Sequence, residues 1–262
     1  MDNDVTRRVD AQAKRPLALS DLRLPEVATV AVTAPHPDDF DAIAITMRWF
    51  HQRGHRVEVA VLTRGTSGVD DGFAGAHTAE EKTLVREQEQ RASCALFGLD
   101  PSALRFLRLG NDEHGKLSLG ESSRAAVTGF LSALQPDIIF MPHGKDSNVA
   151  HQRTHDLVAG IVTAERLSVL LCLNEDPKTL QIRRDLVVEF DEDAAAWKSR
   201  LLTAHASQQA RNIRVRGNGV DERLLDVNRQ SAALVGASSE YAECFELAVY
   251  HEGKLTPVHS CR

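Results

Sequence analysis

Short apolar runs alternate with amphipathic stretches along most of the chain. Runs rich in apolar and β-branched residues predict buried strands at residues 27–33, 57–63, 104–109, 137–142 and 167–173. Apolar positions with helical spacing predict the helices between them at residues 40–52, 79–97, 122–134 and 151–165. Strands that alternate with helices in this way form βαβ units. We therefore expect an α/β fold in which helices flank a mostly parallel sheet.

The pattern weakens in the last third of the chain. Residues 186–190 predict one more strand, residues 193–208 an amphipathic helix, and the Gly- and Arg-rich residues 211–222 a loop. No linker divides the chain, so we expect a single domain over residues 27–262. Residues 1–26 are polar and lack the apolar core of a signal peptide, which predicts a flexible leader.

Composition narrows the class of protein. A chain of 262 residues suits one large α/β domain, and its 42% hydrophobic and 26% charged residues exclude a disordered chain. No apolar run approaches the roughly 18 residues that a membrane span needs. The net charge of -6 argues against a nucleic-acid partner. The four cysteines have no CxxC spacing, which argues against a disulfide framework and favours a reducing, cytoplasmic setting.

His and Asp residues follow two of the predicted strands. His36-Pro37-Asp38-Asp39 comes after the first strand, and His143 and His151 come after the strand at 137–142. Because ligands bind beyond the carboxyl ends of parallel strands, we expect both clusters at one rim of the sheet. Imidazole and carboxylate groups suit a divalent metal, most plausibly zinc with three protein ligands and an open position for water.

His36, Asp39 and His151 would supply those three ligands. Adjacent side chains diverge, so Asp38 would lie beside the bound water and act as general base. Taken singly, each motif has a structural alternative: the two aspartates as a helix N-cap, and His151 with His155 as exposed positions of a helix. Iron, cobalt or manganese would also suit the site.

An ordered series of motifs resembles the PIG-L/LmbE-like family of zinc-dependent N-deacetylases and extends from about residue 27 to 250. The motifs are His36-Pro37-Asp38-Asp39-Phe40; Thr63-Arg64-Gly65 with Gly68; Arg86-Glu87-Gln88-Glu89; Leu109-Gly110-Asn111-Asp112; Asp146-Ser147-Asn148-Val149-Ala150-His151-Gln152-Arg153; Lys198, His205, Ser207 and Gln208; and Tyr241-Ala242-Glu243-Cys244-Phe245. The resemblance implies a Rossmann-like fold and hydrolysis of an N-acyl group, usually acetyl, from an amino sugar or its conjugate. It also implies zinc on the three ligands named above, Asp38 as base, and Arg86 and Asp112 as sugar-binding residues.

Two positions depart from the family pattern. Phe40 replaces the usual Glu, and Asp41 is placed to take over part of its hydrogen bonding. Asn148 stands where many members have a His that stabilises the oxyanion or protonates the leaving amine. Asn148 can donate a hydrogen bond to an oxyanion but cannot deliver a proton. The acid role is therefore open among His143, His155 and the base Asp38, and His155 is also a second choice as a metal ligand.

The expected partner is a small N-acylated sugar or its conjugate, and a homo-oligomer remains open. One alternative function is an amidase for a larger amide, such as a thiol conjugate or a glycopeptide acyl chain. Another is a non-catalytic sugar-binding α/β module. The intact ligand set and the absence of GxGxxG and GxxxxGK[ST] phosphate-binding motifs disfavour that module. His205 is expected to be a buried, hydrogen-bonded histidine rather than a catalytic one.

Overall fold

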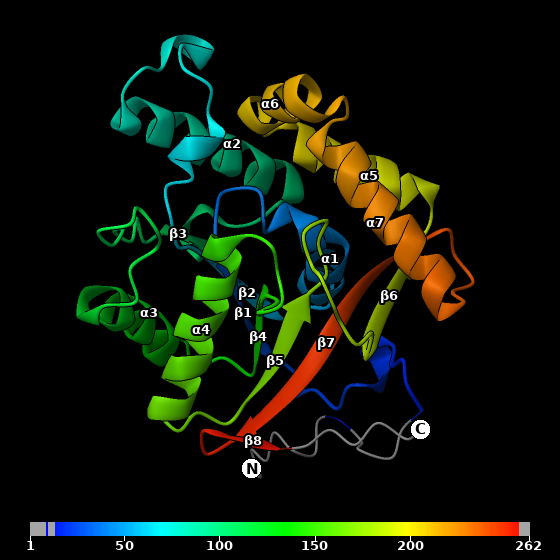
Figure 1. Cartoon of the computed structure of the whole chain (residues 1–262). Coiled ribbons are helices and arrows are strands. Elements are labelled where there is room, and N and C mark those ends of the chain that lie inside the picture. The colour runs from blue at the N-terminus through cyan, green and yellow to red at the C-terminus, as the bar shows by residue number, and fades with distance from the viewer. Residues whose placement is uncertain (1–8, 10–13, 257–262) are drawn as a thin grey trace.

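The computed structural model describes residue 9 and residues 14–256 (Figure 1). One mixed sheet forms its centre, with strand order β3-β2-β1-β4-β5-β7-β6 and β8 paired to β7. The strands are β1 (Thr29–Ala34), β2 (Arg56–Val61), β3 (Leu104–Phe106), β4 (Ile138–Pro142), β5 (Val169–Asn174), β6 (Leu186–Phe190), β7 (Tyr241–His251) and β8 (Lys254–Thr256). β1 to β5 are parallel to their neighbours in this group, whereas β7 is antiparallel to β5, β6 and β8.

Helices cover both faces of the sheet (Figure 1). They are α1 (Ala44–Gln52), α2 (Ala79–Phe97), α3 (Glu121–Leu134), α4 (Val149–Ala164), α5 (Glu192–Thr203), α6 (Ala206–Arg216) and α7 (Val220–Val235). Alternate residues of a strand point to opposite faces, so Val30 and Val32 enter one core and Ala31 enters the other. α1, α2 and α5 contribute to the first core, and α3 and α4 to the second. The expected α/β domain with a mostly parallel sheet is confirmed.

The end of the predicted leader is packed against this domain. Residues 1–8 and 10–13, for which a flexible leader was predicted, lie outside the described residues. Leu17, Leu19 and Leu22 are buried in the first core, and Leu17 exchanges backbone hydrogen bonds with the start of β6. Burial of these apolar side chains in the core offsets the entropy lost when the stretch becomes ordered, so this stretch differs from the flexible segment expected for it.

The last third of the chain differs most from the prediction. The stretch predicted as a loop at residues 211–222 instead contains the end of α6 and the start of α7. Gly217 ends α6 with a φ of 83°, which glycine adopts without strain. The single helix predicted at residues 193–208 is two helices that break at His205. The pattern also gave no indication of β7, the longest strand. Within the described residues, no helix is long and apolar enough to cross a membrane.

Candidate metal centre and active-site pocket

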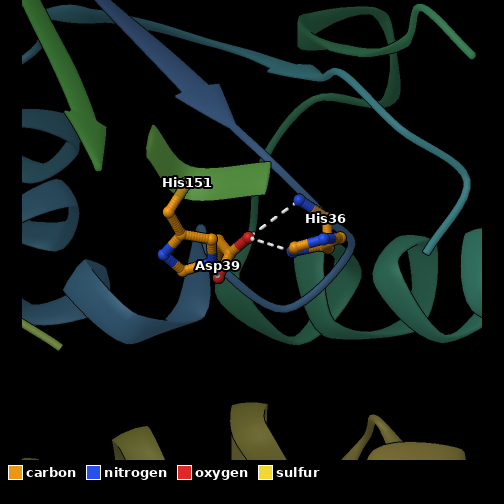
Figure 2. A group of neighbouring side chains, drawn as sticks. All are labelled: His36, Asp39 and His151. Atoms are coloured by element: carbon orange, nitrogen blue, oxygen red, sulfur yellow. Dashed lines mark hydrogen bonds and ion pairs between the residues drawn. The ribbon is translucent and has the colours of Figure 1, made fainter. Parts of the chain in front are cut away.

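The candidate metal ligands lie where two neighbouring strands end. β1 leads into the turn that carries His36 and Asp39, and β4 leads through a loop to His151 in the first turn of α4. β1 and β4 pair in parallel, so both segments emerge at the same edge of the sheet. Figure 2 shows the three side chains gathered at this edge. The structure therefore brings the two sequence motifs together.

The geometry of these three residues suits a single ion. Their ligand atoms all lie within 4.8 Å of one another. Asp39 Oδ2 accepts a hydrogen bond from the backbone N–H of His36 at 2.7 Å, and Asp39 Oδ1 lies 3.5 Å from His151 Nε2. Burial raises the pKa of Asp39, but the charges of both histidines and the hydrogen bond from His36 outweigh burial and hold that pKa well below its usual range. The carboxyl group is thus ionised, as a metal ligand must be.

His151 is held in place by two further carboxylates. Its Nδ1 lies 3.0 Å from Asp146 Oδ2 and 3.2 Å from Asp176 Oδ2. Burial lowers the pKa of His151, but Asp39, Asp146 and Asp176 together raise it to about 10. A carboxylate that accepts from one ring nitrogen of a histidine orients the other nitrogen toward a metal. Asp146 lies in a motif that the sequence singled out. The sequence analysis did not identify Asp176. Its position just after the carboxyl end of β5 is the feature that could have indicated it.

The donor set passes a simple test for a metal site. His151 Nε2 is buried and has no hydrogen-bond partner in the described part of the chain. A buried polar atom without a partner costs free energy unless an ion or water satisfies it, and this one faces Asp39. Two imidazole nitrogens and one carboxylate form the ligand set of an open divalent site. Asp146, His151 and Asp176 also lie close enough to hold an ion, but hydrogen bonding to Nδ1 accounts for that cluster.

Asp38 is turned away from the ligand set by an unusual backbone conformation. Its φ is 108°, a region that non-glycine residues rarely adopt and that often marks functional sites. Its backbone N–H donates to Gln90 Oε1 at 2.9 Å, and its Oδ1 accepts from Arg86 Nη2 at 3.0 Å. Arg86 also donates to the carbonyl of Pro37. Two contacts from α2 therefore fix Asp38 beside the ligands without making it one of them.

A buried polar network around Asp41 supports this turn. The carboxylate of Asp41 is 0% exposed and accepts from Gln90 Nε2 at 3.2 Å and Ser93 Oγ at 2.6 Å. His205 Nε2 lies 2.6 Å from the same carboxylate. The expectation of a buried, hydrogen-bonded His205 is confirmed. Asp41 thus makes the hydrogen bonds that Phe40 cannot make. The ring of Phe40 is buried against Phe97 in the core.

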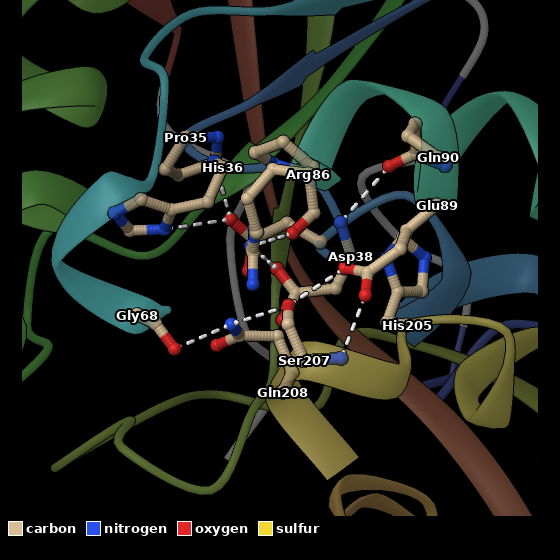
Figure 3. Close-up of polar contacts among 12 residues, drawn as sticks. Pro35, His36, Asp38, Gly68, Arg86, Glu89, Gln90, His205, Ser207 and Gln208 are labelled. Carbon is tan, nitrogen blue, oxygen red and sulfur yellow. Dashed lines mark hydrogen bonds and ion pairs between the residues drawn. The ribbon is translucent and has the colours of Figure 1, made fainter. Parts of the chain in front are cut away.

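The helix α6 is tied to α2 and to the loop after β2. Ser207 donates from its backbone N–H and its hydroxyl to Glu89, at 2.6 and 2.7 Å. Gln208 Nε2 donates to the carbonyl of Gly68 at 2.8 Å. A Cβ on Gly68 would lie 2.8 Å from the terminal amide of Gln208, so a larger residue at this position would require the Gln208 side chain to move. These contacts place α6 and the loop of residues 63–68 as walls of one cavity (Figure 3).

That cavity is a pocket of about 770 Å³ whose lining includes His36, Asp38 and Asp39. Arg86 and Asn148 also line it. Arg86 is 2% exposed and is bound to the turn that carries Asp38, yet its Nε and Nη1 have no partner among the described residues. Asn148 caps α4, because its Oδ1 accepts from the N–H of Ala150. The side chain of Asn148 therefore has only its Nδ2 group left to donate a hydrogen bond to a ligand in the pocket.

Two residues expected in the site are directed elsewhere. His143 is 4% exposed, its Nδ1 accepts from the N–H of Lys145, and its Nε2 lies 3.2 Å from Glu246 on β7. Both ring nitrogens thus have structural partners. His143 also does not line the pocket, so the acid role expected of it is not supported. The alternative, His155, lies beside Asp156 at 3.1 Å and belongs to neither candidate ligand group.

Asp112 supports a loop rather than the pocket wall. Its carboxylate accepts from the backbone N–H groups of His114 and Lys116 and from Arg153. These contacts lower the pKa of Asp112 to about 2. Its neighbours Asn111 and Lys116 line the pocket, whereas Asp112 does not. The sugar-binding role expected of Asp112 therefore has no support in this geometry.

Several solved structures that share this fold are deacetylases by name. N,N'-diacetylchitobiose deacetylase from Pyrococcus horikoshii is 21% identical over 86% of this chain and 85% of its own, with a TM-score of 0.70. The A40926 pseudoaglycone deacetylase is 16% identical over 86% and 99%, with a TM-score of 0.64. A deacetylase of teicoplanin biosynthesis is 16% identical over the same shares, with a TM-score of 0.65. At these identities the likeness establishes the fold.

No curated protein matches the chain. A family match covers residues 31–162, the segment from β1 through most of α4. This segment contains His36, Asp38, Asp39 and His151, so the match includes every candidate ligand and the neighbouring carboxylate. With half of its length matched, including its candidate metal centre, the chain belongs to the PIG-L family, described as GlcNAc-PI de-N-acetylase.

Proposed function

We propose that the protein is a metal-dependent N-deacetylase that removes an acetyl group from the nitrogen of an amino sugar or its conjugate. The observation that supports this most is the arrangement of His36, Asp39 and His151 around one point, with Asp38 beside them in an open pocket. Membership of the PIG-L family supports the same reaction class. A pocket of about 770 Å³ has room for more than one acetylated sugar, which supports a conjugate as substrate.

His36, Asp39 and His151 would hold the ion, and zinc suits these donors best. When bound, a divalent ion supplies a Lewis acid for the amide carbonyl and lowers the pKa of water. Asp38 accepts the proton of the attacking water as the new C–O bond forms. Arg86 and Gln90 keep Asp38 in place through the contacts described above.

The proton then has one short route to the leaving group. As the C–N bond breaks, the amine nitrogen needs a proton, and Asp38 carries the one taken from water. His143 is buried away from the pocket, so we assign this return step to Asp38. Asn148 Nδ2 is the donor available to the oxyanion in the transition state. The products are acetate and the free amino sugar.

The test combines metal content with release of free amine. We expect Asp38→Asn to lose about 10²- to 10⁴-fold in kcat, the usual contribution of a general base, while retaining its metal. His151→Ala should lose both metal and activity. Asp71→Asn is a matched control, since Asp71 is 70% exposed and lies outside the pocket. An Asp38→Asn variant as active as the wild type would overturn the assignment.

A further inference from the structure

A second, much smaller cavity shares two carboxylates with the main pocket. Its volume is about 50 Å³, whereas that of the main pocket is about 770 Å³. Asp38, Asp39 and Lys178 line both cavities. The other lining residues of the small cavity are Ala42, Asp176, Pro177, Val220, Arg223 and Leu224. The two substituents of an amide held beside Asp38 can therefore extend into two spaces of very different size.

One side of the small cavity is apolar. Ala42 comes just after the turn that carries Asp38 and Asp39, and it packs against Val220 and Leu224. Val220 and Leu224 are one helical turn apart on α7, so they lie on the same face of that helix. They are 8% and 7% exposed. This apolar wall can contact the methyl or methylene groups of a ligand next to the proposed catalytic centre.

Hydrogen bonds to two neighbouring helices hold that wall in place. The backbone N–H of Val220 donates to Gln209 Oε1 on α6 at 2.8 Å. The carboxylate of Asp221 accepts from Gln209 Nε2 at 2.8 Å and from Ser199 Oγ on α5 at 2.7 Å. A ligand too long for the cavity would have to break these contacts in order to displace the first turn of α7. The wall should therefore discriminate sharply between ligands of different length.

The size and the charges of the cavity both favour a short occupant. A single water-sized group needs about 10–15 Å³ of such a volume, so about 50 Å³ holds three or four of them. The carbon, oxygen and methyl of an acetyl group fit this space, whereas a hexanoyl chain exceeds it. A longer chain would also lie against Asp176, Lys178 and Arg223, and covering charged groups with apolar atoms costs free energy.

We propose that the acyl group of the substrate enters this small cavity and that Val220 and Leu224 of α7 limit its length. The inference rests on the proposed function, because it names the residues that set the acyl specificity of the same site. The sugar then occupies the large pocket on the other side of the reacting carbon. Val220 and Leu224 lie outside the segment 31–162 that the family match covers, so they are features of this chain beyond that match.

A series of acyl chains tests the limit on length. Amine release would be measured for N-acetyl-, N-butyryl- and N-hexanoylglucosamine with the full chain. We expect kcat/KM to fall about tenfold or more from acetyl to butyryl and again from butyryl to hexanoyl, because each added methylene must fit against the wall of α7.

Substitutions on α7 test the residues. Leu224→Ala enlarges the cavity and should raise the butyryl-to-acetyl ratio of kcat/KM about tenfold. Val220→Ala removes fewer core atoms and should change the ratio in the same direction, so the test remains where Leu224→Ala fails to fold. Leu225→Ala is the matched control, since Leu225 packs against the main core and does not line the cavity. Its ratio should equal that of the wild type.

Hydrolysis of the hexanoyl compound as fast as that of the acetyl compound would refute the proposal. So would a ratio that both enlarging variants leave unchanged, or that Leu225→Ala raises as much as they do. Failure of the proposed function appears differently, as no amine released from any of the three sugars. Calorimetry on the full chain would then compare their binding, and a hexanoyl compound that binds as tightly as the acetyl compound would refute the small cavity as an acyl site.

Discussion

Replacing Gln90 by methionine tests whether the turn at Asp38 is held by α2. Gln90 is 0% exposed and bridges two groups: its Oε1 accepts from the Asp38 N–H at 2.9 Å, and its Nε2 donates to Asp41 at 3.2 Å. Methionine has nearly the same volume and makes neither hydrogen bond. The variant therefore removes the hydrogen bonds without opening a cavity.

The loss can be calculated from the two contacts. A hydrogen bond between neutral groups contributes about 1 kcal/mol and one to a charged group about 1.5–3 kcal/mol. The Gln90→Met variant should thus be less stable by about 2.5–4 kcal/mol. The released turn also lets Asp38 leave its strained φ of 108°. Because a misplacement of about 1 Å in a catalytic group can cost 10²-fold in rate, we expect kcat to fall by about that factor.

Urea denaturation, metal analysis and amine release would measure the three consequences. Metal content should stay at the wild-type value, since Gln90 contacts none of the ligands. Gln88→Met, at an exposed position of the same helix, is the control and should change stability by less than about 0.5 kcal/mol. A Gln90→Met protein that is as stable and as active as the wild type would show that the turn holds itself, and the reasoning would be wrong.

Three further predictions concern buried and partly buried charged groups behind the pocket. Asp146→Ala should weaken metal binding by about 10- to 100-fold, because Asp176 alone then holds Nδ1 of His151. Competition with a chelator would measure the loss of affinity. Lys198 and Glu243 form an ion pair in the core with 2.7 Å between Nζ and Oε1. Lys198→Met leaves Glu243 charged and without its counterion, so urea denaturation should show a loss of stability of about 3–5 kcal/mol. Burial raises the pKa of Glu246, but its hydrogen bonds and ion pairs outweigh burial and lower that pKa below its ordinary value of 4.5. A carboxyl group whose pKa is lowered by folding stabilises the fold fully above its ordinary pKa of 4.5. The stability advantage of the wild type over Glu246→Gln should therefore shrink below pH 4.5 and disappear once the pH has fallen through the lowered pKa.

The grouping of the three candidate ligands was predictable because it depends on local rules. Parallel strands deliver whatever follows them to one edge of the sheet, so the motifs after β1 and β4 had to meet if these strands were neighbours. His36 and Asp39 lie within one turn of each other, and His151 lies in the first turn of a helix. Beyond the pairing of β1 with β4, no long-range detail was needed to bring these three residues together.

The errors arose where tertiary packing decides. β7 enters the sheet antiparallel between β5 and β6, and nothing in its local sequence reveals that place. Glu246 on this strand lies 3.2 Å from His143 Nε2, a contact that a prediction without β7 could not include. The predicted loop at 211–222 failed because Gly217 and Gly219 separate two helices, which the composition alone does not distinguish from one irregular segment.

The adjacent carboxylates Asp38 and Asp39 acquire different roles from their backbone rather than from their chemistry. Asp39 folds back onto the N–H of His36 and faces His151. The positive φ of Asp38 rotates its side chain out of that group and toward Arg86. A glycine at position 38 would adopt this φ more easily but would have no carboxylate, whereas a relaxed Asp38 would lose its position beside the ligands. The strain must therefore be offset by neighbours, and Gln90 and Arg86, both on α2, make the contacts that do so. We therefore expect the proposed activity of this centre to depend on the packing of α2 as directly as on the candidate ligands themselves.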